Sequence, residues 1–134
     1  MSNTGYALTG FVSWALFLLV AMETIRTYLV LTGKVAANGF APDNSGLSPF
    51  MQRLARAHIN CIEGLPIFGG LLAIAIMTSR TGITDSLASW LLAARIVQSI
   101  IHLVSTSPVA VSLRFTAFAV QMAIGVYWSW KLMV

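Results

Sequence analysis

Four long apolar stretches dominate the sequence and limit the folds that it can adopt. They occupy residues 6–31, 49–78, 86–104 and 113–134. As a helix, an apolar stretch of about 20 residues spans the hydrocarbon core of a bilayer. Charged residues make up only 9% of the chain, whereas a soluble domain carries about 25%. The sequence therefore predicts an all-α membrane protein, with residues 1–134 forming a single four-transmembrane-helix up-down bundle.

Turn-forming residues separate the predicted helices. Gly, Pro, Asn, Asp and Ser are frequent in 32–49, and shorter connections occupy 79–85 and 105–112. Ser48 and Pro49 are typical of the N-cap and first position of a helix. The short connection at 79–85 predicts an antiparallel hairpin, so both termini should lie at one end of the bundle and the first and third loops at the other.

Positive residues are more frequent at the end with the first and third loops. Those at that end are Lys34, Arg53, Arg56 and Arg114, whereas Arg80 and Lys131 lie at the opposite end. Because cytoplasmic loops carry an excess of Lys and Arg, we expect the first and third loops to be cytoplasmic. The expected location is an integral, multi-pass position in a bacterial inner membrane, with the lipid bilayer as the main surroundings.

The composition also argues against several functions. The net charge of +4 is spread through apolar segments, whereas a nucleic-acid-binding protein concentrates its charge in a basic patch. The single cysteine, Cys61, excludes an intramolecular disulfide and a multi-cysteine metal site. His102 has no second metal ligand at a suitable spacing, so no metal site is predicted.

One segment, RLARAHINCIEGLP, carries polar residues into the second apolar stretch. Arg53, Arg56, Asn60 and Glu63 are spaced 3, 4 and 3 residues apart. On an α-helix they share an arc of roughly 80°. Polar side chains within a membrane span are costly, and they usually face a bundle interior or an aqueous cavity at a functional site.

A second polar stripe lies in the third apolar stretch. Arg95, Gln98 and His102 are spaced 3 and 4 residues apart, and Arg114 begins the fourth stretch. The predicted topology brings both stripes and Arg114 to the same leaflet. Four arginines against one Glu63 predict a basic pocket for an anionic ligand with carboxylates, next to an apolar partner from the bilayer.

The residues also allow simpler interpretations. The polar stripes would hold the helices together if they bonded only to one another. Arg53 would then be an interfacial anchor. Arg26 is a possible site residue, but it lies three residues after Glu23 and is equally suited to an ion pair at the membrane surface.

The polar segment resembles the signature of the MAPEG family, the membrane-associated proteins in eicosanoid and glutathione metabolism. The matching residues are Arg56, Ala57, His58, Asn60, Glu63 and Pro66. The similarity also covers the chain length, the four spans, the longer first loop, the Arg95 region and Arg114. It implies a homotrimer that holds glutathione between neighbouring subunits near the cytosolic face.

The resemblance also implies roles for individual residues. Arg56, Asn60 and Glu63 would hold glutathione as co-substrate, together with Arg95, Gln98 and His102 of the third span. Arg114 would be the catalytic residue that stabilises the glutathione thiolate. The implied activity is that of a glutathione S-transferase or peroxidase acting on a lipophilic electrophile or a lipid hydroperoxide.

The sequence departs from the family pattern in the fourth span. Phe115 replaces a serine of the prostaglandin E synthase-like members, so that isomerase activity is not expected. Phe118, a possible site residue, replaces a tyrosine. A non-catalytic lipid-binding or structural member of the family therefore stays open as an alternative. A second alternative, based on Glu23, is a small four-helix multidrug transporter that uses this residue as its intramembrane carboxylate.

Overall fold

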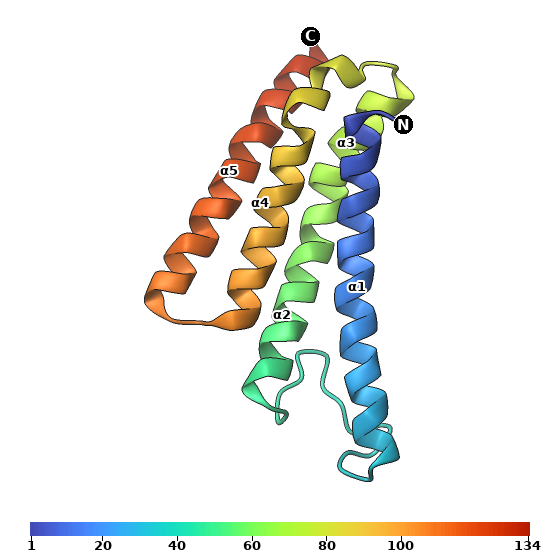
Figure 1. Cartoon of the computed structure of the whole chain (residues 1–134), viewed down its shortest axis with the longest axis vertical. Helices are drawn as coiled ribbons and strands as arrows, with labels where there is room; N and C mark the ends of the chain where they lie inside the picture. Colours follow the sequence, from blue (N-terminus) through green and yellow to red (C-terminus); the bar gives the residue numbers. More distant parts are fainter.

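The computed structural model describes residues 1–134 and contains no strand. Four helical spans are long and apolar enough to cross a membrane. Both termini lie at one end of the bundle, and the first and third loops lie at the other (Figure 1). The elements are α1 (Asn3–Leu31), α2 (Pro49–Gly64), η1 (Leu65–Gly69), α3 (Gly70–Met77), η2 (Thr81–Ile83), α4 (Asp85–Val104) and α5 (Pro108–Met133).

Serine caps set where three of the helices begin. The Ser48 hydroxyl accepts from Met51 N, and the Ser107 hydroxyl accepts from Ala110 N at 3.2 Å. A proline follows each of these two serines. The N–H group at this first helical position has no partner within the helix, so proline loses no hydrogen bond there. Helix α5 consequently starts at Pro108 instead of near residue 113, and the third loop shrinks to 105–107.

Ser2 caps α1 in the same way by accepting from Gly5 N, so this helix begins at Asn3 and not near residue 6. A side-chain oxygen at the N-cap satisfies one of the first free N–H groups of a helix. The caps at Ser2 and Ser107 explain why α1 and α5 begin before their apolar cores.

The second span contains a π-helical turn, η1, around Pro66. Proline has no N–H to donate to the carbonyl four residues earlier, and its ring clashes with that carbonyl. The wider turn relieves the clash. The regular backbone hydrogen bonds, each to the carbonyl four residues earlier, resume when Gly70 N donates to Pro66 O. The chain therefore crosses the bundle as one span, Pro49–Met77, as the sequence predicted for 49–78.

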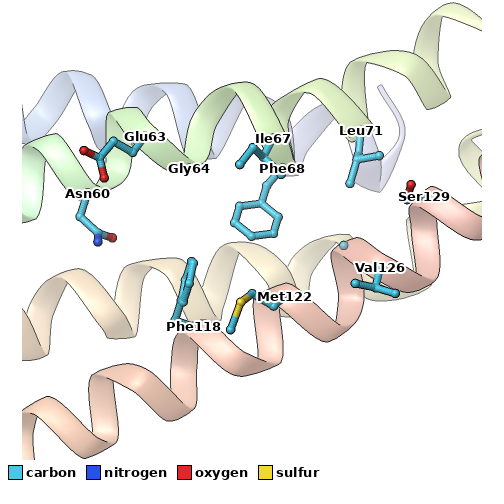
Figure 2. Close-up of a pocket in the computed structure, with 11 residues that line it drawn as sticks. Asn60, Glu63, Gly64, Ile67, Phe68, Leu71, Phe118, Met122, Val126 and Ser129 are labelled. Carbon is cyan, nitrogen blue, oxygen red and sulfur yellow. The ribbon is translucent and has the colours of Figure 1, made fainter.

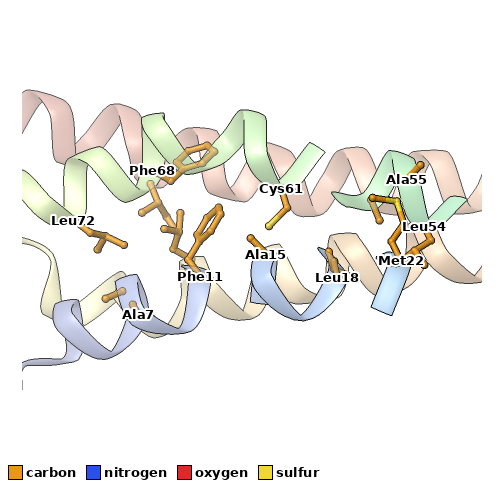
Figure 3. Close-up of a cluster of buried hydrophobic side chains, with 14 of the residues drawn as sticks. Ala7, Phe11, Ala15, Leu18, Met22, Leu54, Ala55, Cys61, Phe68 and Leu72 are labelled. Carbon is orange, nitrogen blue, oxygen red and sulfur yellow. The ribbon is translucent and has the colours of Figure 1, made fainter. Parts of the chain in front are cut away.

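Helix α4 packs against α1, α2 and α5, and α5 packs mainly against α4. Alanines and large apolar side chains from α1, α2, η1 and α3 interlock in the core, which Figure 3 shows around Phe11, Leu18 and Leu72. In Figure 1 the loop end of α5 diverges from α2.

Candidate functional site

A chain of hydrogen-bonded polar side chains crosses the middle of the bundle, from the buried Gln121 to the partly buried Asn60. Gln121 of α5 donates from Nε2 to Gln98 Oε1 of α4 at 2.8 Å, and Gln98 Nε2 donates to Asn60 Oδ1 of α2 at 3.1 Å. Arg95 Nη1 donates to the same Asn60 oxygen at 2.7 Å. Since water cannot satisfy polar groups in a membrane interior, such bonds join the helices that carry them.

Arg95 is 1% exposed, and no acidic side chain pairs with it. Its guanidinium carbon lies 5.2 Å from the ring centre of Phe11 and 5.9 Å from that of Phe68. Aromatic faces attract cations by about 2 kcal/mol or more where water is excluded. Gly64 makes this placement possible, because a Cβ atom there would collide with Arg95 Nη2.

A cleft of about 620 Å³ separates the second span from α5. Asn60 and Glu63 form its polar end (Figure 2). Beyond them the walls are mainly apolar, and Ser129 lies at the far end. The wall residues are Gly64, Ile67, Phe68 and Leu71 on one side and Phe118, Met122, Gly125 and Val126 on the other.

Two aromatic rings lie on opposite walls of the cleft. Phe68 and Phe118 meet edge to face, with ring centres 6.3 Å apart. Figure 2 shows this pair between the Asn60 end and the Met122–Val126 end. The cleft therefore joins a hydrogen-bonding compartment to an apolar one.

Positive residues gather at the same end of the bundle as the first and third loops. Arg56 is exposed and Arg114 is half-buried, and neither forms an ion pair. His102, near the end of α4, is buried. In the first loop, the pKa of the Asp43 carboxyl is lowered mainly by the Ser45 N–H at 3.0 Å and less by the charge of Arg56.

The two other arginines of the predicted pocket are occupied. Arg53 Nε donates to Leu103 O at 2.8 Å, so it caps the end of α4. Arg95 lies behind Asn60 and is not among the residues that line the cleft. Arg56 and Arg114 are therefore the unpaired arginines of the predicted pocket, and neither of them lines the cleft itself.

A model of the MAPEG family matches residues 4–134, which is nearly the whole chain. The chain belongs to the MAPEG family. It is thus an integral, multi-pass membrane protein related to glutathione and eicosanoid metabolism. No curated protein and no solved structure gives a match.

Membership in the MAPEG family leaves the chemistry of this chain open. Members of the family use glutathione, and the family includes glutathione transferases and peroxidases as well as non-catalytic proteins. Any choice between these activities must therefore rest on how this chain's own residues are arranged.

The other residues named from the sequence lie apart from the cleft. Arg26 forms the one ion pair of the MAPEG chain, with Glu23 at 3.1 Å. It also donates to the Asn44 side chain at 2.6 Å and to Ala41 O at 3.2 Å, so it holds the first loop against α1. Glu23 is consequently the partner of a loop anchor and not a lone intramembrane carboxylate of the kind that a transporter needs.

Gln121 is a polar residue of the bundle interior that the predicted site did not include. It is fully buried in the middle of α5 and forms the far end of the hydrogen-bonded chain. A buried amide in an otherwise apolar span is itself a signal, because such a group is costly without a partner. Its partner, Gln98, lies on α4, and the packing of α4 against α5 brings the two side chains together.

Proposed function

We propose that this protein is a glutathione-dependent membrane transferase or peroxidase that acts on lipophilic electrophiles or lipid hydroperoxides. The observation that carries the proposal is the two-part cleft, in which Asn60 and Glu63 form one end and the remaining walls are mainly apolar. A charged peptide suits the polar part, and a lipophilic molecule that enters from the bilayer suits the apolar part.

Asn60 and Glu63 of the polar end and the two unpaired arginines each have a distinct proposed role. Arg56 pairs with a glutathione carboxylate, Asn60 donates to a carbonyl or carboxylate oxygen, and Glu63 accepts from the ammonium group. Arg114 stabilises the thiolate and is the catalytic residue. The buried Arg95 and Gln98 donate to Asn60 and hold it in place, and the buried His102 completes the glutathione site.

The proposed chemistry starts from the thiolate sulfur. In a transferase reaction the sulfur bonds to an electrophilic carbon, and a leaving group departs with the electron pair of the broken bond. In a peroxidase reaction the sulfur takes the terminal oxygen of a hydroperoxide, and the lipid alkoxide gains a proton and leaves as an alcohol. A second glutathione then condenses with the oxidised sulfur to give the disulfide and water.

Glu63 also supports an assembly of several copies. It is exposed, and it lies at the centre of the 29-residue span Pro49–Met77. A bare carboxylate at that depth is costly against lipid, so a second copy of the chain should cover it. By resemblance to the family, we propose that the assembly is a homotrimer with the first and third loops cytoplasmic. Native mass spectrometry tests the oligomeric state, and a monomer would contradict the proposed trimer.

Glutathione should raise the thermal unfolding midpoint of the detergent-solubilised protein. Ligand at 100 times its dissociation constant stabilises the folded state by about 2.7 kcal/mol. Arg56→Ala should reduce the shift, whereas Lys34→Ala, which removes an exposed charge from the first loop, should leave it intact. Purified protein should also conjugate glutathione to a generic aromatic halide. An unchanged midpoint at millimolar glutathione, with no conjugation, would argue for the non-catalytic alternative.

A further inference from the structure

The hydrogen-bonded chain through Gln121, Gln98 and Asn60 has a fixed direction. At one end, Gln121 Nε2 donates to Ala117 O at 3.2 Å, and a backbone carbonyl can only accept. At the other end, Arg95 donates to Asn60 Oδ1 at 2.7 Å, and a guanidinium can only donate. Both ends therefore require the same orientation of the amides between them.

This direction determines which atom Asn60 offers to the cleft. Asn60 Oδ1 accepts from both Arg95 and Gln98, which uses its two lone pairs. The NH₂ group of Asn60, with two donors, is the part that remains available, and Asn60 lines the cleft beside Glu63. A ligand at this point must consequently present an oxygen acceptor.

We infer that Gln121 is a positioning residue that acts through Gln98 to keep the Asn60 NH₂ group directed into the cleft. The ligand atom that it selects is a carbonyl or carboxylate oxygen of a peptide. The inference rests on the proposed function, since the peptide concerned is glutathione. Gln121 itself never touches the ligand, because it is fully buried and does not line the cleft.

The test is Gln121→Met, which keeps the side-chain length and removes the donor. We expect the KM for glutathione to rise about fivefold, as for the loss of one hydrogen bond. The kcat at saturating glutathione and the KM for the electrophile should stay within about twofold. Gln52→Met is the matched control, because Gln52 bonds to Leu47 O at the start of α2, outside the chain of amides.

A double-mutant cycle separates positioning from general damage. In an Asn60→Ala background, Gln121→Met should have no further effect on the KM for glutathione, because the group that it positions is gone. An equal rise in both backgrounds, or no rise in either, would overturn the inference. Gln98→Met breaks the same chain in its middle and serves if Gln121→Met does not fold.

A measurement without ligand distinguishes failure of the inference from failure of the proposed function. In protein labelled with ¹⁵N-asparagine, Gln121→Met should shift the Asn60 side-chain amide signal and leave that of Asn44 unchanged, because Asn44 bonds to Arg26 and Met51 O instead. An unmoved Asn60 signal would overturn the inference. A shifted signal in a protein that does not bind glutathione would count against the proposed function alone.

Discussion

Replacing Arg114 by alanine is expected to lower kcat for glutathione conjugation by about 100- to 1,000-fold. A loss of this size is usual when a preorganised hydrogen-bond donor that stabilises negative charge in an active site is removed. Arg114 forms no ion pair, so its charge remains available to a thiolate. Steady-state rates at saturating glutathione and a fixed electrophile concentration measure the effect.

The matched control for Arg114→Ala is Lys131→Ala on the same helix. Lys131 is exposed in the last turn of α5, at the opposite end of the bundle from Arg114. Its loss should change kcat by less than about twofold, since exposed charges at long range are screened. Activity that survives Arg114→Ala unchanged would remove Arg114 from the mechanism.

Gly64→Ala is expected to destabilise the protein by about 1–3 kcal/mol, the usual effect of inserting a methyl group into a packed site. The new methyl group would lie too close to Arg95 Nη2 and would push the guanidinium away from Asn60. Loss of that contact should also weaken glutathione binding. Thermal unfolding and glutathione titration measure the two effects.

Gly70→Ala provides the control for this substitution in the same span. A Cβ atom at Gly70 meets no heavy atom within 4 Å. Alanine also favours a helix over glycine by about 1 kcal/mol, so Gly70→Ala should be neutral or stabilising. Equal stabilities of the two variants would show that Gly64 is not needed to admit Arg95.

The membrane-spanning architecture could be predicted because long apolar stretches leave few alternatives. The errors lie at helix ends, where single side chains decide. Ser107 and Pro108 start α5 earlier than its apolar core suggests, and Ser2 does the same for α1. The π-helical turn at Pro66 was also not predicted, because its geometry depends on how the neighbouring helices accommodate the proline.

Only part of the predicted set of site residues lines the cleft. Asn60, Glu63 and Phe118 line it, whereas the cleft lining does not include Arg56, Arg95, Gln98, His102 and Arg114. Helical spacing brought Asn60 and Glu63 to one face, and both line the cleft. Spacing alone could not show that Arg53 caps a carbonyl of α4, or that Arg95 is buried between two aromatic rings. Those contacts join helices far apart in the sequence, so they depend on the packing of the whole bundle.

The most direct test of the central claim is an ultraviolet difference spectrum of glutathione added to the purified protein at neutral pH. Our account predicts a saturable thiolate absorbance that Arg114→Ala abolishes and Lys131→Ala preserves. A spectrum without saturable thiolate absorbance, at glutathione concentrations well above those in cells, would contradict it.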